Sequence, residues 1–353
     1  MLKRAKLLLL ASAARVGLSI RILESGWRCS RLLILCYHGV SLDDEHLWNP
    51  GLFLSPDQLR RRFQILTDLR CNVLPLGEAL DRLRAGALPP RGVVLTFDDG
   101  YYNFHYLALP MLREFGFPAT VYLTTYYCCF NRPVFDPACD YLLWKARGKT
   151  FCLPELSSDA IVPSGAGHQA TAARVKDYAL RQRLSGSEKD TLLARLAASL
   201  GIDYEAFCRR RILNLMTPDE VRQAAAAGTD IQLHTHRHRV SADREVFLRQ
   251  IEDNRHVITA ITGAPAIHLC YPSGYHRPEF ADWLREDGVA SAVTTRSGLA
   301  ARTTPPYFLP RLVDTSGLTE TEFTAWVSGY AAWLPRRRVP MDSHQLLEDP
   351  LQQ

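Results

Sequence analysis

The sequence of 353 residues has no Cys-x-x-Cys pair, no internal repeat and no low-complexity tract. Its nine cysteines are an odd number, and Cys36 and Cys270 lie in apolar, strand-like runs where a thiol acts as a small hydrophobic group. This pattern favours a reducing compartment over a disulfide framework. With 47% hydrophobic and 22% charged residues, the composition is typical of globular proteins and argues against a polytopic membrane protein. A chain of this length can bury a core that needs no cross-links.

Net positive charge is absent beyond the first 31 residues, where acids balance the lysines and arginines. The whole chain carries +5, and residues 1–31 contribute +6, which leaves −1 for residues 32–353. Set against Glu24 alone, the basic residues of this segment are Lys3, Arg4, Lys6, Arg15, Arg21, Arg28 and Arg31. Because phosphate contacts need clustered lysine and arginine, we expect no nucleic acid to bind the body of the chain.

Three interpretations of residues 1–30 stay open. Lys3, Lys6, Arg21 and Arg28 would fall in a narrow arc of one helix, which favours a basic amphipathic helix over residues 1–28 on an anionic membrane surface. The apolar run 7–10 with the following Ala-Ser-Ala could instead be a signal or an anchor, although it is shorter than the roughly 20 residues that span a bilayer. The segment could also pack on the body. We expect a cytoplasmic protein or one on the cytoplasmic membrane face, with export as the alternative.

The rest of the chain alternates between strand and helix patterns. Short apolar runs predict buried strands over residues 31–37, 92–97, 119–124, 230–234, 267–271 and 289–294. Capped segments of helical periodicity lie between them, and six or seven strands in this order favour a parallel α/β fold, a β/α barrel. Residues 131–215 break the rhythm and predict a partly helical insertion. The expected parts are a basic segment 1–30, a domain 31–330 with this insertion, and a polar tail 331–353.

Two adjacent carboxylates, Asp98 and Asp99, follow one of these strands and precede Gly100. Their charges repel unless a cation or a proton is shared. Glycine permits a sharp turn here, and catalytic groups of barrel folds lie at this end of the strands. An ordinary Asp-Gly turn is the alternative interpretation.

Three histidines, His234, His236 and His238, end a later strand. One helical turn would place His234 and His238 on one side, toward one ion, with His236 pointing away, whereas an extended chain would align all three. A basic solvated turn is the alternative. Together with an aspartate, two histidines make a site of three protein ligands with positions open for water, and the second aspartate could then act as a general base.

Three further segments end predicted strands and could converge on the same rim. His38 follows the first strand, the run Tyr271–Tyr275 follows a later one, and Arg311 follows a proline. A packed core histidine and a plain surface arginine are the alternatives for His38 and Arg311.

These motifs resemble those of the polysaccharide deacetylases, the NodB-homology proteins of carbohydrate esterase family 4. Thr-Phe-Asp-Asp-Gly at 96–100, His-Thr-x-x-His at 234–238 and Tyr-Pro-x-Gly at 271–274 stand in the family's order, and the resemblance covers roughly residues 31–315. It implies a distorted (β/α)7-type barrel. It also implies a hydrolase that removes N-acetyl groups from an amino-sugar polysaccharide or a lipid-linked glycan by attack of metal-bound water.

The same resemblance implies a role for each site residue. Asp98 would be the general base, and Asp99, His234 and His238 would hold a divalent metal, usually Zn²⁺. The sugar would meet the turn made by Tyr271, Pro272, Ser273, Gly274 and Tyr275, and a backbone N–H near Tyr275 would help stabilise the oxyanion.

The sequence departs from the family pattern at two points. It has Leu269 where the family often has an arginine that orients the base, so Arg311 is a candidate substitute. The family's late Leu-x-His motif is absent, but some deacetylases of exported biofilm polysaccharides carry Tyr-His on the first strand, as Tyr37 and His38 do here. His38 is therefore the candidate general acid.

Two other functions stay open at this point. One is a metal amidohydrolase acting on a small non-sugar amide, and the other is a non-catalytic sugar-binding barrel. Retention of Asp98 together with the three candidate ligands argues against the second. The sequence leaves the sugar, its linkage and the oligomeric state open.

Overall fold

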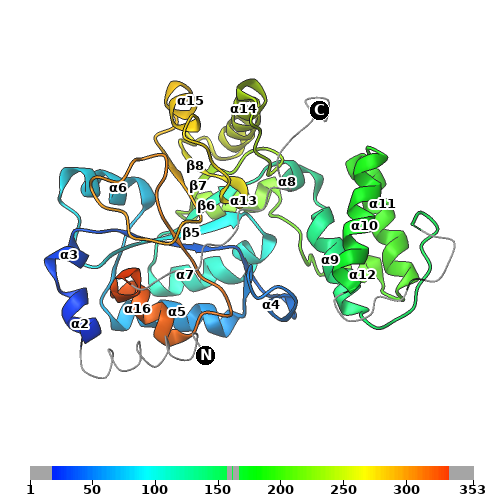
Figure 1. Cartoon of the computed structure of the whole chain (residues 1–353), viewed down its shortest axis with the longest axis horizontal. Helices are drawn as coiled ribbons and strands as arrows, with labels where there is room; N and C mark the ends of the chain where they lie inside the picture. The colour runs from blue at the N-terminus through cyan, green and yellow to red at the C-terminus, as the bar shows by residue number, and fades with distance from the viewer. Residues whose placement is uncertain (1–17, 157–160, 162–166, 334–353) are drawn as a thin grey trace.

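The computed structural model describes residues 18–156, 161 and 167–333, and its centre is one curled parallel sheet (Figure 1). The strand order is β10-β1-β5-β6-β7-β8-β9, with β4 paired beside β5, and every pairing is parallel. The strands are β1 (Leu33–Tyr37), β4 (Asn72–Val73), β5 (Gly92–Asp99), β6 (Thr120–Leu123), β7 (Asp230–Leu233), β8 (His268–Cys270), β9 (Ser291–Val293) and β10 (Leu312–Val313). A parallel bridge from Val293 to Leu309 brings the β9 edge toward β10. The predicted distorted barrel of the (β/α)7 type is confirmed.

Helices connect the strands, as parallel pairing requires. They include α5 (Pro56–Asp68), α6 (Leu76–Ala85), α7 (Leu109–Phe115), α13 (Pro218–Ala226), α14 (Arg244–Thr262), α15 (Phe280–Glu286) and α16 (Glu320–Val327), with a π-helix, η1 (Phe104–Ala108), before α7. The expected start of α5 is present: Ser55 caps the helix in a capping box with Gln58, and Pro56 is its first residue. A second, two-stranded sheet pairs β2 (Gly39–Val40) with β3 (Phe53–Leu54).

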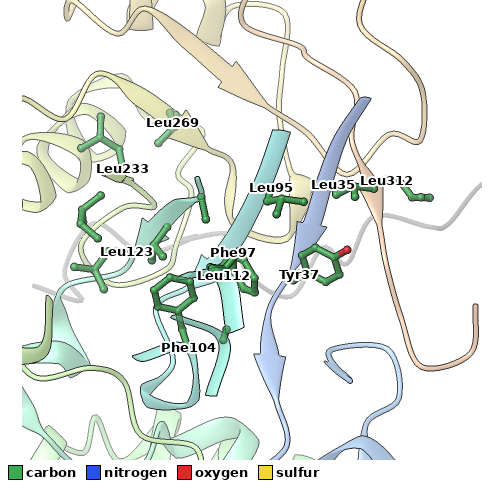
Figure 2. Packing of buried hydrophobic residues seen from close by; sticks show 14 of the residues in the cluster. Leu35, Tyr37, Leu95, Phe97, Phe104, Leu112, Leu123, Leu233, Leu269 and Leu312 are labelled. Carbon is green, nitrogen blue, oxygen red and sulfur yellow. The ribbon is translucent and has the colours of Figure 1, made fainter. Parts of the chain in front are cut away.

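Side chains alternate between the two faces of the main sheet. Leu33, Leu35 and Tyr37 of β1 pack with the helices in the larger core, where Figure 2 shows Leu35 and Tyr37 beside Leu95 and Phe97. Ile34 packs in a smaller cluster on the other face, with residues such as Val94, Tyr122, Cys270 and Leu309. Asp98 has the parity of Val94 and Thr96, so the strand period directs it into the barrel interior and not into the helix layer.

The described residues between 135 and 209 form a helical lobe that stands apart from the sheet, at the right in Figure 1. Its helices in the described residues are α9 (Phe135–Lys145), α10 (Gly167–Arg181), α11 (Gly186–Ser199) and α12 (Tyr204–Arg209), and α8 (Tyr126–Phe130) leads into it. The lobe has its own apolar cluster, which includes Leu142, Val175 and Leu196. The insertion boundaries 131–215 stay a prediction.

The N-terminal residues that the structure describes pack on the body. Helix α2 (Leu18–Leu23) ends before Ser25, and Ser25 caps a second short helix, α3 (Gly26–Cys29). Arg28 is fully buried, and its guanidinium donates to the carbonyl oxygens of Val327, Arg31 and Gly92. The expectation that Arg28 lies on the polar arc of one surface helix with Arg21 is therefore wrong, because the chain turns at Ser25. Lys3 and Lys6 lie outside the described residues.

The boundary of the tail at residue 331 stays a prediction. Residues 330–333 form a short 3₁₀ helix, η3 (Tyr330–Trp333), in which Ala331 is buried, and residues 334–353 lie outside the described part of the chain. Among the described residues, no helix combines the length and apolarity that crossing a membrane requires.

Candidate active site

Three side chains meet at the carboxyl ends of β5 and β7. Oδ1 of Asp99 lies 3.2 Å from Nε2 of His234 and 3.2 Å from Nε2 of His238. Ligands at 2.0–2.1 Å from a tetrahedral zinc ion are about 3.3 Å apart, so these spacings match the edges of such a site. One carboxylate and two imidazoles are also the donors that zinc and similar ions prefer. The residues present therefore fit a divalent metal ion.

The two histidines differ in their surroundings. His234 is buried, and its Nδ1 lies 2.8 Å from the carbonyl oxygen of Cys270, to which it would donate as N–H. That bond leaves the Nε2 lone pair directed toward Asp99, as in metal sites where a carbonyl orients the ligand. The side chain of His238 is 31% exposed. His234 therefore has a fixed orientation, whereas His238 lies at the solvent side.

The backbone between the two histidines forms a turn and not the helical turn that the spacing suggested. Thr235 and His238 have φ of 63° and 55°, and Asp99 on the facing strand has 71°. Non-glycine residues seldom adopt this left-handed conformation, because it is strained and the surrounding structure must hold it in place. Residues in this conformation occur most often at functional sites. His236 points elsewhere, with its Nδ1 2.8 Å from Oγ1 of Thr125.

Polar side chains from neighbouring elements hold this turn, and the sequence analysis did not identify them. Asn254 of α14 accepts a hydrogen bond from the His234 N–H and donates to the Leu123 carbonyl and to Thr125. Gln250 accepts from the Arg237 N–H. A usable signal existed, because both residues fall at the helical spacing of the buried positions Phe247, Ile251 and Ile258.

Asp98 and Arg311 form a buried ion pair in the barrel interior. Both carboxylate oxygens lie 2.7 Å from guanidinium nitrogens, and Arg311 also donates to the Thr294 carbonyl. Arg311 is thus neither exposed nor a plain surface charge. Burial alone would raise the pKa of Asp98, but the charge and hydrogen bonds of Arg311 outweigh burial and hold the pKa well below its usual range.

Two thiols complete the surroundings of Asp98. Sγ of Cys36 and Sγ of Cys270 lie 3.3 Å and 3.4 Å from its Oδ2, in the geometry of S–H donors. Burial raises the pKa of both thiols well above the ordinary value, so they stay protonated. The sequence analysis treated Cys36 and Cys270 only as apolar residues, and in this interior they also act as hydrogen-bond donors.

His38 lies beside this pair. Its Nε2 is 3.8 Å from Oδ2 of Asp98, and its Nδ1 has no hydrogen-bond partner among the described residues. Burial lowers the pKa of His38, more than the negative charges of Asp98 and Asp99 raise it. The imidazole is therefore neutral at pH 7, and either nitrogen is able to carry its proton.

The Tyr271–Tyr275 run forms a compact turn after β8. Tyr271 and Pro272 are buried, Ser273 has φ 53°, and Gly274 has φ 71° with Thr295 directly against its α-carbon. The Tyr275 N–H donates to the Pro272 carbonyl within the turn. The N–H of Tyr275 itself is thus engaged within the turn, and the oxyanion donor near Tyr275 stays a prediction. The Tyr275 hydroxyl accepts from Nε of Arg277.

Comparison with known proteins identifies the same segments. Residues 85–134 and 185–292 match the family model described as polysaccharide deacetylase, and together they make up somewhat less than half of the chain. The matched segments contain Asp98, Asp99, His234 and His238. His38 and Arg311 lie outside them, as do residues 135–184 of the lobe.

Individual relatives agree with this match. A poly-β-1,6-N-acetyl-D-glucosamine N-deacetylase of Escherichia coli K12 is 30% identical over 97 residues, which cover 27% of this chain and 14% of the relative's length. Streptococcus pyogenes deacetylase PplD, solved with acetate, superposes with a TM-score of 0.55 at 18% identity over 83% of this chain and 96% of its own. IcaB from Ammonifex degensii gives a TM-score of 0.53 at 16% identity over 85% and 97%. These two structures share the fold of this chain.

Proposed function

Taking as premise the polysaccharide deacetylase domain that this chain carries, we propose that it hydrolyses N-acetyl groups on an amino-sugar polymer or a lipid-linked glycan, and that it needs a divalent metal ion, most simply Zn²⁺. The observation that carries the proposal is the convergence of Asp99, His234 and His238 beside the buried Asp98–Arg311 pair. The relative from E. coli, by its name, acts on poly-β-1,6-N-acetyl-D-glucosamine, and a polymer of this kind is the first substrate to test.

Asp99, His234 and His238 would hold the ion in this scheme. When bound, a divalent ion acts as a Lewis acid that polarises the acetyl carbonyl and lowers the pKa of water. The protein's own contribution is orientation: the Cys270 carbonyl and Asn254 fix His234, and the turn with positive φ at Thr235 and His238 presents both imidazoles to one point.

Asp98 and His38 would move the protons. Asp98, kept ionised and aligned by Arg311, takes a proton from the attacking water. His38, which is neutral before the reaction and 3.8 Å from Asp98, then receives that proton. It passes the proton to the amine nitrogen as the carbon–nitrogen bond breaks. The balance is one water and one acetamide converted to acetic acid and a free amine, which leave as acetate and ammonium, with no net proton gained or lost by the protein.

The experiment is acetate release from poly-β-1,6-N-acetylglucosamine and from chitin oligomers. We expect activity that a chelator removes and added Zn²⁺ restores, and a loss of 100-fold or more in kcat for Asp98→Asn. Unchanged acetate release by Asp98→Asn would refute the assignment of the base, and activity that survives complete metal removal would refute the metal.

Two substitutions separate the roles of the histidines. His234→Ala should lose the metal, whereas His38→Ala should keep normal metal content and lower kcat by 100-fold or more, since general acid–base catalysis contributes roughly that much. Metal analysis of both purified variants, beside their kinetics, makes the comparison. A His38→Ala protein that lacks metal would make His38 part of the metal site instead.

A further inference from the structure

The two ends of the described chain meet in one partly exposed aromatic patch. The rings of Trp27 on α3 and Trp333 on η3 have centroids 4.9 Å apart, and Gly329 packs against Trp27. Trp333 is 56% exposed, and Ile20 on the adjoining helix α2 is also 56% exposed. Large apolar side chains with the exposure of Trp333 are few on the described surface, and one that packs on a second tryptophan indicates an interaction site.

Guanidinium groups border this patch. A cavity of about 510 Å³ is lined by Trp27, Trp333 and Phe308 together with Arg31 and Arg296. Arg31 stacks over the Trp27 ring at 4.5 Å and donates to the Trp27 carbonyl. In the described part of the chain, no ion pair joins Arg31 or Arg296 to a carboxylate, whereas nearby Glu24 pairs with Arg91. We call Trp27, Arg31, Arg296 and Trp333 the terminal face.

Short basic stretches stand in the sequence beyond both ends of the described chain. Residues 1–17, which join the described chain at Leu18, contain Lys3, Arg4, Lys6 and Arg15 and no acid. After Trp333 the sequence has Arg336, Arg337 and Arg338 before its first acid at position 342, although three acids in all balance these arginines over residues 334–353. The second basic stretch thus begins three residues after one of the paired tryptophans.

We propose that the terminal face docks on a membrane surface rich in anionic lipid headgroups. Tryptophan favours the boundary between headgroups and acyl chains, and arginine near the surface is attracted to anionic lipids. The observations fit a bilayer better than a protein groove, because Arg31 and Arg296 belong to the face itself, the sequence adds short basic stretches at 3–15 and 336–338, and a wide anionic surface attracts all of them. This site differs from the basic surface helix expected over residues 1–28, because it excludes Arg28, which is buried, and includes Trp333 from the other end of the described chain. It is independent of the catalytic assignment.

The test is co-sedimentation of the full-length protein with vesicles of phosphatidylcholine alone and with 30% phosphatidylglycerol. We expect binding to the anionic vesicles that falls steeply with added salt, and little binding to the neutral ones. Each arginine near such a surface is worth about fivefold in binding. Changing Arg336, Arg337 and Arg338 together to glutamine should therefore weaken binding by tenfold or more, and Trp333→Ser should weaken it further.

Matched controls come from exposed residues elsewhere on the surface. The control triple variant removes the same charge by changing three arginines that are each more than half exposed to glutamine: Arg181, Arg209 and Arg222. Tyr106→Ser, at 58% exposure, matches Trp333→Ser. The controls should keep wild-type vesicle binding. Three results would overturn the proposal. The control triple variant could lose as much vesicle binding as the Arg336, Arg337 and Arg338 variant, the wild type could fail to bind anionic vesicles, or the protein could prefer a soluble anionic polymer to the vesicles. Acetate release stands or falls separately.

Discussion

Replacing Arg311 by methionine tests the central electrostatic feature of the site. The substitution keeps the length and most of the volume of the side chain and removes its charge, which leaves Asp98 as a buried carboxylate with two thiol donors. Removing one partner of a buried pair costs about 3–5 kcal/mol. The two charge-assisted bonds at 2.7 Å give a similar figure, about 1.5–3 kcal/mol each. We expect the free energy of unfolding at pH 7 to fall by about 3–5 kcal/mol.

The pH dependence gives a sharper signature than the size of the loss. In the wild type the pKa of Asp98 lies below its unfolded value, so the carboxylate stabilises the fold above pH about 4, and that stability is lost as pH falls through the folded pKa. In Arg311→Met, only the smaller effects of His38, His234 and the two thiol donors oppose burial, so burial raises the pKa of Asp98 and the folded state binds the proton more tightly than the unfolded state. Stability should therefore fall as pH rises, and the loss should be smaller at pH 5 than at pH 7.

The assay is urea unfolding of the metal-free wild type, Arg311→Met, Asp98→Asn and the double variant at both pH values. We expect the double variant to be more stable than the sum of the single losses predicts, by about 2 kcal/mol, because the second change removes the charge that the first left unpaired. A loss below 1 kcal/mol, equal losses at the two pH values, or additivity would refute this account of the pair.

Two further substitutions test the backbone around the site. Gly274→Ala should lower the free energy of unfolding by about 2–4 kcal/mol, because an added Cβ would clash with Oγ1 of Thr295. Gly263 has nearly the same positive φ but open space around it, so Gly263→Ala should lower it by only about 1 kcal/mol. Equal losses for the two variants in urea unfolding would contradict the contact with Thr295. Asn254→Ala should weaken metal binding tenfold or more in competition titrations, because the N–H of His234 loses its hydrogen bond to Asn254. The control Asn72→Ala changes an exposed asparagine and should leave the metal affinity unchanged. Equal metal affinities for the two variants would show that Asn254 does not position His234.

Periodicity and strand ends were enough to predict the sheet and to place its catalytic rim. The helix 244–262 and the main strands are present where the apolar patterns put them, because packing against one core follows local sequence closely. Strand β10, only two residues long, gave no pattern of its own and exists because Leu312 and Val313 pair with β1. Its position is what carries Arg311 to Asp98.

The finer geometry of the site depends on contacts that no spacing rule contains. The His234–His238 turn takes its shape from Asn254 and Gln250, which are distant in sequence. The surface helix proposed from Lys3, Lys6, Arg21 and Arg28 assumed one uninterrupted helix. Ser25 ends that possibility in the described chain, and the Val327 and Gly92 carbonyls bind Arg28 in the interior. The spacing of residues around an ideal helix predicts which side chains share a face only where the chain forms one uninterrupted helix.

Strand β5 connects the Arg28 contact at one end of the sheet to the two carboxylates at the other end. At its first residue, Gly92 accepts a hydrogen bond from Arg28, the neighbour of Trp27, and at its last two residues stand Asp98 and Asp99. Asp98 and Asp99 lie six and seven residues beyond Gly92, which at about 3.3 Å per residue places them about 20–23 Å from the Arg28 contact. A protein resting on its paired tryptophans would hold its reactive centre above the headgroups, out of reach of the sugar nearest the lipid and level with units farther along a glycan.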